Sequence, residues 1–440
     1  MAAFTQGVTF KVLGIALLAL LMLVPLAQVN DLVREREGRA REATARVAER
    51  WGGQQLVGGP VLVVPVRWQE QRENGFVTLE ERAFVLPDRV RLDATLTPEL
   101  RRYGLYETPV YVAAIKVEGR FAAGDIAAIA SNGREPQWQR AELRVPVADV
   151  RGIRRASALR VGEAEAAFGP ESGGVAGVAA ISAPIALDAA AWAGPLPFAF
   201  ELGLAGSERF SALPLARQTD VAIRGQWPDP GFDGAFLPAE RSVASDGFSA
   251  SWQVLDLNRR IAQRWHEHEA GSIALAASAF GVALVQPASP YQQNVRAGKY
   301  GVLFIALTFV AFFLFEVLRG LRVHPVQYML VGLALCAFYV VLLALSEQAG
   351  FARAYVVAAA ASVSMVGGYA AAVLRQRRAG WMLGGLLGLV YALLYGLVTS
   401  EDHALLMGAL ALLAAVALLM FLTRRVDWYA MTPRRTERPM

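Results

Sequence analysis

Long apolar runs lie at both ends of the chain and leave a long polar stretch between them. A membrane-spanning helix needs about 20 mostly apolar residues. Runs that meet this requirement are residues 12–29, 301–318, 327–346, 354–374, 381–398 and 404–422. The pattern predicts a membrane protein of the α+β class, with an amino-terminal anchor helix and a carboxy-terminal bundle of five transmembrane helices.

The first apolar run has two interpretations. Lys11 followed by an apolar core is typical of a cleaved signal peptide. The run ends in VPLAQVN, which lacks a clean small-x-small cleavage site, so the sequence favours an uncleaved anchor. Residues 31–50 combine dense mixed charge with helix-forming residues, and this predicts a charged helical stalk that continues the anchor.

The middle of the chain, residues 51–299, has the pattern of a β-rich domain. GGPVLVVPVRW is an apolar run bounded by Gly and Pro, and YETPVYVAAIKVEGRF alternates apolar and polar residues. Gly, Pro, Asp and Asn separate runs of this kind. Many short strands of this kind predict one or two antiparallel sandwiches. ESGGVAGVAA (171–180) and the segment 187–194 do not fit the alternation and are expected to be loops or short helices.

Charge supports a membrane topology. Charged residues make up 18% of the chain, well below the quarter that is usual in soluble proteins. Short loops rich in arginine stay in the cytoplasm. Arginines follow the second, fourth and sixth runs: Arg319, Arg322, Arg375, Arg377, Arg378, Arg424, Arg425, Arg434, Arg435 and Arg438. They predict that both termini are cytoplasmic and that residues 31–299 lie outside, which in a bacterium with two membranes is the periplasm. The same placement argues against nucleic acid as a partner.

Motifs for catalysis and cofactor binding are missing from the sequence. It has no P-loop, no GxGxxG after a strand, no HExxH and no CxxC, and we expect no catalytic site, cofactor or metal. Cys336 is the single cysteine, so the polar region has no disulfide. His266 and His268 would share one face of a strand and bind zinc with a third ligand. Their segment is more typical of a helix or loop, which favours a solvated polar loop.

Two features of the apolar runs leave alternatives open. Glu316 is the sole acidic or basic residue within these runs, and it either pairs with a nearby arginine or serves a function, as acids inside membranes often do. Gly384 and Gly388 form a GxxxG pattern. It predicts close helix packing inside the bundle, with a homo-oligomer as the alternative.

Four stretches carry a family resemblance: residues 51–65, 101–121, 248–265 and, most specifically, 291–351. They resemble the CreD family of bacterial inner-membrane proteins. The resemblance implies an anchor, a large periplasmic domain and a membrane bundle. It also implies a role in cell envelope integrity that is linked to a two-component system, to colicin tolerance and to responses to β-lactams. It brings no enzymatic activity and no cofactor.

The resemblance also marks candidate functional positions of unknown role. Gln348 stands where many relatives are expected to carry histidine, which weakens any proposal that needs an acid–histidine pair there. The positions that match the family signature are Glu316, His324, Pro325, Gln327, Tyr328, Ser346 and Glu347.

We therefore predict a non-enzymatic protein that resides in the lipid bilayer and contacts a periplasmic or envelope partner. The alternatives are a membrane sensor acting through a separate partner and a transporter of a small envelope component. The transporter is disfavoured because the apolar runs carry few polar side chains. The predicted parts are an anchor (1–30), a stalk (31–50), a periplasmic domain (51–299), a bundle (300–422) and a basic cytoplasmic tail (423–440).

Overall fold

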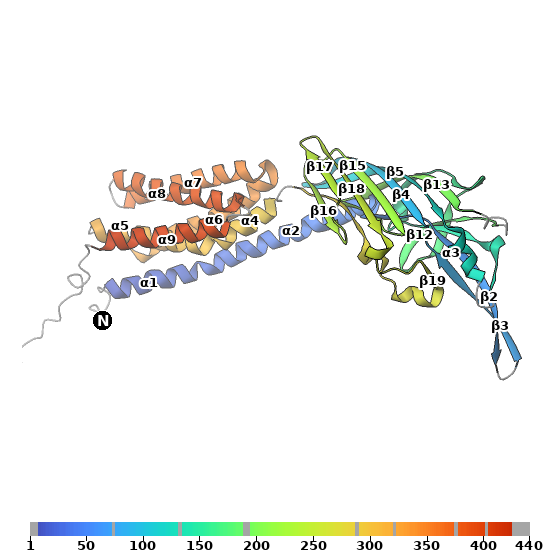
Figure 1. The fold of residues 1–440 in the computed structure, drawn as a ribbon. Coiled ribbons are helices and arrows are strands. Elements are labelled where there is room, and N and C mark those ends of the chain that lie inside the picture. Colours follow the sequence, from blue (N-terminus) through green and yellow to red (C-terminus); the bar gives the residue numbers. More distant parts are fainter. Residues whose placement is uncertain are drawn as a thin grey trace, which may run out of the picture. The chain divides into compact units, whose positions relative to one another are not determined.

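The computed structural model describes residues 8–72, 75–130, 134–187, 194–286, 290–319, 323–373, 377–400 and 404–424. Its contacts divide the chain into two compact units (Figure 1). The helical unit comprises Met1–Ala40 and Ala288–Met440, and the β-rich unit comprises Arg41–Pro287. By contacts the divisions fall after Ala40 and Pro287. The predicted boundaries at residues 51 and 299 stay predictions.

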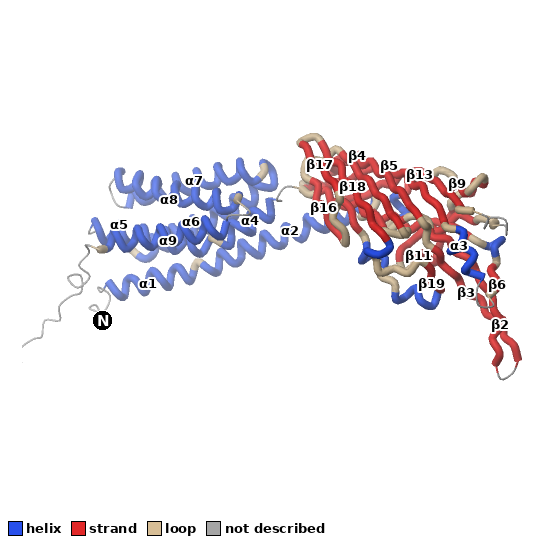
Figure 2. The backbone as a smooth tube through the Cα atoms, in the orientation of Figure 1, coloured by secondary structure: helices blue, strands red, loops and turns tan. Residues whose placement is uncertain are grey.

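The largest sheet of the β-rich unit has nine strands in the order β10, β9, β13, β5, β4, β15, β18, β17, with β8 also paired to β13. Strands account for most of this unit (Figure 2). The members of this sheet are β4 (Arg89–Tyr103), β5 (Tyr106–Phe121), β8 (Ile153–Ala156), β9 (Leu159–Val161), β10 (Ala164–Ala166), β13 (Leu196–Ser207), β15 (Gln218–Gly225), β17 (Glu240–Ala244) and β18 (Gly247–Leu255).

Two further sheets complete the unit. The seven-stranded sheet runs β11, β12, β7, β2, β3, β19, with β6 paired to β2, and the four-stranded sheet runs β1, β14, β20, β16. Their members are β1 (Gln55–Gly58), β2 (Val61–Arg72), β3 (Gly75–Val85), β6 (Glu135–Pro136), β7 (Glu142–Pro146), β11 (Gly169–Val175), β12 (Val178–Pro184), β14 (Arg209–Leu213), β16 (Pro230–Gly234), β19 (Arg264–His266) and β20 (Phe280–Leu284). A short helix, α3 (Ala123–Ala127), follows β5.

The main core of this unit contains apolar side chains from all three sheets. In the first half of β4, up to Leu96, every second residue is buried, because successive side chains of a strand point to opposite faces. Alternation of this kind predicted the strand over β5, and an apolar run bounded by Gly and Pro predicted the strand over β2. Both strands are confirmed.

Most strand pairs are antiparallel, as expected, but two are not. β4 pairs with β15 in parallel, and so does β1 with β14. Alternation within a strand specifies its buried face but not its neighbours, which here come from distant parts of the chain. The expectation of a loop or short helix at 171–180 is wrong, because β11 and β12 form a hairpin whose turn contains Gly177 at φ 83°. Residues 188–193 lie outside the described residues.

The end of the long helix α2 (Leu23–Trp51) is fastened within the β-rich unit. The guanidinium carbons of Arg101 and Arg154 lie 4.4 and 4.9 Å from the centre of the Trp51 ring. The indole nitrogen of Trp51 donates a hydrogen bond to the Tyr111 carbonyl at 3.3 Å. Gly52 follows at φ 136°, a conformation that favours glycine and lets the chain leave the helix for β1.

The helical unit begins with α1 (Val8–Leu21) and the first part of α2. Pro25 explains the break between them, because proline lacks an N–H and its ring clashes with the carbonyl of residue 21, four positions earlier. Helical hydrogen bonds continue on both sides of the break, and α2 then extends without interruption through the predicted stalk. The other helices of the unit are α4 (Pro290–Lys299), α5 (Gly301–Arg319), α6 (Pro325–Ala349), α7 (Phe351–Val373), α8 (Arg377–Thr399) and α9 (Ala404–Thr423).

Several of these helices are long and apolar enough to span a membrane. Within the described residues they are Phe10–Trp51, Pro325–Ala349, Phe351–Val373 and Gly380–Thr399. The pair α4–α5 is bent by 46° and would make a fifth if it forms one span. The apolar part of α9 is shorter, Leu406–Leu418. The sequence predicted six spans, so the apolar anchor and several apolar carboxy-terminal helices are confirmed, but the number six is not.

Glycines allow α7 and α8 to pack closely. A Cβ atom added to Gly380 would overlap the Ala371 side chain and lie 2.7 Å from the Gly367 carbonyl oxygen. The Cα of Gly384 is also close to this site, 3.4 Å from a Cβ added to Gly367. A Cβ on Gly388 would meet no atom within 4 Å. Gly384 therefore packs inside the helical unit together with Gly380, a partner that the GxxxG pattern did not identify, and a homo-oligomer through Gly384 and Gly388 stays a prediction.

We expect Gly380→Ala to destabilise the helical unit, because its methyl group has no room unless α7 or α8 shifts. Overpacking of this kind costs about 1–3 kcal/mol. Thermal unfolding of the detergent-solubilised chain should show a lower melting temperature. Gly385→Ala is the matched control, since a Cβ there meets nothing within 4 Å. Equal melting temperatures for the two variants would contradict the packing argument.

Candidate functional site

Glu316 lies at the centre of a polar cluster in the helical unit. Its side chain is 4% exposed and forms an ion pair with Lys11 of α1. The Val323 backbone N–H donates to Oε1 at 2.9 Å, and the Tyr328 hydroxyl donates to Oε2 at 2.9 Å. We call Lys11, Glu316, Tyr328 and the Val323 amide the Glu316 cluster. It joins α1, α5, the turn after α5 and α6.

The chemistry of this cluster is that of a satisfied buried charge. A carboxylate among apolar helices is costly unless it is paired and hydrogen-bonded. Glu316 has an ammonium, an amide and a hydroxyl as donors, so both of its oxygens have partners. The sequence offered a nearby arginine as one possible partner of Glu316. Among the described residues its cationic partner is instead Lys11, 305 positions away in the sequence. The side chain of Arg319 and all of Arg322 lie outside the described residues.

His324, Pro325 and Gln327 form the amino-terminal cap of α6. The Nδ1 atom of His324 accepts from the Val326 amide at 3.3 Å, and the Gln327 side chain accepts from the His324 amide at 2.9 Å. This is a reciprocal capping box, and Pro325 at the first helical position has no N–H to leave unpaired. The three signature residues thus fix where α6 begins, one turn before Tyr328.

Ser346 and Glu347 belong to a second cluster at the other end of α6. The Tyr291 hydroxyl donates to Glu347 at 3.0 Å, and the guanidinium of Arg36 lies 3.8 Å from the same carboxylate. The buried amide of Asn294 donates to Ser346 Oγ at 2.9 Å. We call Arg36, Tyr291, Asn294, Ser346 and Glu347 the Glu347 cluster. It joins α2, α4 and α6.

The two clusters are separated by the length of α6. Tyr328 and Ser346 are about five helical turns apart, or about 27 Å. The hydrocarbon core of a bilayer is about 30 Å thick. Between the clusters α6 buries mainly apolar and aromatic residues, such as Leu335 and Phe338. The spacing places the two sets of polar contacts at the two boundaries of an apolar layer.

A third polar cluster lies in the β-rich unit. The Nδ1 atoms of His266 and His268 lie 3.1 and 2.9 Å from the two carboxylate oxygens of Glu81, and the two rings stack 6.0 Å apart. Arg134 reaches Glu81 at 3.0 Å and also contacts the His266 ring. Burial, followed by the nearby Arg134 charge, lowers the pKa of His266. Glu81 is therefore paired with one guanidinium and two imidazole rings.

This cluster corrects one expectation from the sequence. His266 lies on the edge strand β19 and is 29% exposed, so it is not part of a solvated loop. Among the described residues, no group of three His, Cys, Asp or Glu side chains is arranged to hold a metal ion.

Sequence reasoning identified Glu316 and Tyr328 but not their connection to α1. It also missed Arg36, Tyr291 and Asn294, which contact Ser346 or Glu347. One signal was available: a single lysine at the start of the first apolar run and a single acid within the later runs have opposite charges and need partners. Nothing comparable distinguished Asn294 from the other polar residues before α5.

Comparison with known proteins supports the family resemblance. A family model described as "Inner membrane protein CreD" matches residues 7–429. The chain is 34% identical over 422 residues to the inner membrane protein CreD of Escherichia coli (strain K12), covering 93% of this chain and 91% of that protein. Neither description is that of an enzyme.

A solved structure, an M1 zinc metallopeptidase from Deinococcus radiodurans, aligns with 81% of this chain and 96% of its own at 9% identity and a TM-score of 0.21. A TM-score this low does not establish a shared fold.

We expect Glu316→Gln to destabilise the helical unit by about 3 kcal/mol, because it leaves the Lys11 ammonium without its counter-charge. The double variant Lys11→Met with Glu316→Gln should recover much of this loss, because neither charge remains. Melting temperatures of the solubilised chain measure both effects. Asp31→Asn is the control, since Asp31 is 74% exposed and pairs with Arg34 at 3.6 Å, and it should change little. If the double variant is as unstable as Glu316→Gln, the ion pair does not explain the cost.

Proposed function

The chain belongs to the CreD family of inner membrane proteins, and from this membership we propose that it supports cell envelope integrity through its β-rich unit. It is a multi-pass inner membrane protein with several apolar helices. In this proposal the helices hold the β-rich unit at the outer surface of the membrane, where it contacts an envelope partner. The protein itself catalyses no reaction.

One observation carries the proposal: the signature side chains are engaged in fastening helices together. Glu316 and Tyr328 join α5 to α6 and to Lys11, His324 and Gln327 cap α6, and Glu347 joins α6 to Tyr291. Side chains used in this way build a scaffold. If the helical unit is a scaffold, the β-rich unit is the part that binds the envelope partner.

The proposed orientation places both termini in the cytoplasm and the β-rich unit in the periplasm, with six spans. The support comes from charge and hydropathy. Arginines follow alternate apolar runs, and such residues are retained in the cytoplasm. The six spans would be Phe10 onward in α1–α2, the bent pair α4–α5, and α6, α7, α8 and α9.

A sensor is the second candidate, and the shape of α2 favours it. α2 is one helix whose Arg36 pairs with Glu347 in the helical unit and whose Trp51 is held in the β-rich unit. A change at Trp51 would therefore reach the Glu347 cluster through continuous helix. In this case a separate partner would receive the signal.

The orientation can be tested by cysteine labelling, because Cys336 is the single native cysteine and is buried. Leu257→Cys places a thiol at a position that is 89% exposed in the β-rich unit. We expect a membrane-impermeant maleimide to label it in spheroplasts. Arg424→Cys should be labelled only after the membrane is permeabilised, and the parent chain serves as the background. Labelling of Arg424→Cys in sealed spheroplasts, with Leu257→Cys protected, would reverse the proposed topology.

The function can be tested in a deletion strain challenged with a detergent, a β-lactam and a colicin. We expect the full chain to restore tolerance. If the β-rich unit carries the function, a chain ending at Pro287 and held by α1–α2 should restore most of it at a matched protein level in the membrane fraction.

A truncated chain that reaches this level without restoring tolerance would favour the sensor. A full-length Glu347→Gln variant should then lose the response, whereas Asp31→Asn should keep it. A deletion strain with unchanged tolerance to all three agents would contradict the envelope role itself.

A further inference from the structure

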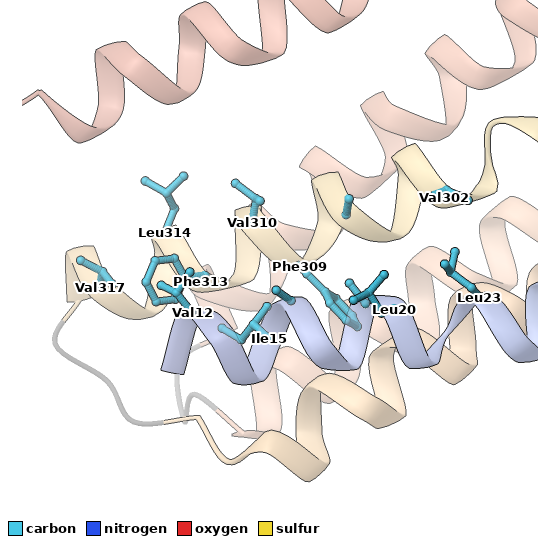
Figure 3. Close-up of a pocket in the computed structure, with 13 residues that line it drawn as sticks. Val12, Ile15, Leu20, Leu23, Val302, Phe309, Val310, Phe313, Leu314 and Val317 are labelled. Atoms are coloured by element: carbon cyan, nitrogen blue, oxygen red, sulfur yellow. The ribbon is translucent and has the colours of Figure 1, made fainter. Parts of the chain in front are cut away.

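A long apolar groove lies between the amino-terminal helices and α5. It has a volume of about 640 Å³, and all thirteen residues that line it are apolar. Figure 3 shows Val12, Ile15 and Leu20 on one wall and Phe309, Phe313 and Val317 on the other. Both walls belong to the helical unit.

The groove needs an apolar occupant. In a membrane protein the medium around these helices is hydrocarbon, and a lining without polar groups cannot hold ordered water. An unfilled gap would also deprive the lining side chains of their van der Waals partners. A hydrocarbon chain satisfies both requirements.

A charge beside the groove distinguishes a lipid from an apolar helix. The ammonium of Lys11 precedes the lining residue Val12. A phospholipid joins apolar chains to an anionic phosphate, so it matches both the apolar lining and a neighbouring cation, whereas an apolar transmembrane helix matches the lining alone.

One end of the groove carries a cation. Val12 follows Lys11 and Val317 follows Glu316, so the ion pair of the Glu316 cluster stands beside the two lining residues at this end. The Lys11 side chain is 32% exposed. An ammonium has three N–H donors, and among the described residues Glu316 is its one acceptor. The Glu316 carboxylate also has Val323 and Tyr328 as donors, so Lys11 has donors left for an acceptor outside the protein.

A second groove lies on the other side of α5. It has a volume of about 400 Å³, and its lining comes from α5, α8 and α9. Val310 and Leu314 line both grooves. These two residues therefore form a ridge with an apolar groove on each side, an arrangement that suits a ligand with two chains.

From this geometry we propose that the helical unit binds a phospholipid. One acyl chain fills the groove between α1 and α5, the second lies beyond the ridge of Val310 and Leu314, and the phosphate accepts hydrogen bonds from Lys11. Lysine is a common phosphate binder that acts as a point charge. This site is separate from the β-rich unit, and it does not depend on the proposed envelope function.

The test is to count retained lipids on the full chain by native mass spectrometry. The probe is dioleoyl phosphatidylglycerol added to mixed micelles, and dioleoylglycerol, which lacks the phosphate, is the comparison lipid. We expect the wild-type chain to retain one phosphatidylglycerol molecule. We expect retention of dioleoylglycerol to be at least tenfold lower.

Ala306→Trp should reduce retention of phosphatidylglycerol at least tenfold, because Ala306 lines the groove and an indole would fill it. Ala16→Trp fills it from the opposite wall and protects against failure of one variant to fold. Ala361→Trp is the matched control on an exposed face of α7 and should retain the lipid. Each variant is first checked for an unchanged elution volume.

Several results would overturn the proposal. A wild-type chain that retains no phospholipid has no such site. Equal retention by Ala306→Trp, Ala16→Trp and the control would place the lipid elsewhere. Equal retention of both lipids would remove the role of Lys11. If the wild-type chain is a dimer that retains no lipid, and Ala306→Trp makes it a monomer, the groove is occupied by a second copy of the chain.

Discussion

The buried carboxylate of Glu316 constrains the whole helical unit. An acid among apolar helices is stable only where donors surround it, and its donors come from separate parts of the chain: Lys11, the Val323 amide and Tyr328. The requirement therefore holds α1 against helices that follow it by about 300 residues in the sequence. It also fixes the position of Val323, two residues before α6 begins, because the Val323 amide is one of the donors. The same pair adjoins Val12 and Val317 of the apolar groove.

The polar contacts of the helical unit are concentrated at the two ends of α6. At one end the Glu316 cluster and the cap formed by His324 and Gln327 set the start of the helix, and at the other the Glu347 cluster receives α2 and α4. Between them, α6 is packed mainly through apolar and aromatic side chains. Elsewhere in the unit, Gly367 and Gly380 let α7 and α8 approach closely, and the Tyr355 hydroxyl donates to the Tyr391 carbonyl at 2.7 Å. Packing in a membrane lacks the hydrophobic drive found in water, so polar contacts and small residues give the helices one arrangement.

The sequence predicted local features well and long-range partners poorly. Alternation predicted the strand β5, a bounded apolar run predicted β2, and hydropathy predicted α6 and α7, because all three patterns depend on residues near one another. The parallel pairing of β4 with β15 has no local signature. The contacts of Lys11 with Glu316 and of Asn294 with Ser346 likewise depend on tertiary packing. The signature residues were identified by resemblance. The structure adds that two of them, His324 and Glu347, lie at opposite ends of the same helix, α6.

The helix break at Met22 separates α1, which contains Lys11, from α2, which contains Arg36 and Trp51. From Leu23 to Trp51 the helix is continuous, and this segment contains Arg36 of the Glu347 cluster. Lys11 lies beyond the break, where Pro25 leaves the Leu21 carbonyl without its helical hydrogen bond and gives α1 freedom to keep its own orientation. The Glu316 cluster is thus suited to hold α1 in place while α2 adjusts. In the proposed sensor, a signal arriving along α2 would meet Glu347 first, because Arg36 belongs to α2 whereas Lys11 lies on the other side of the break.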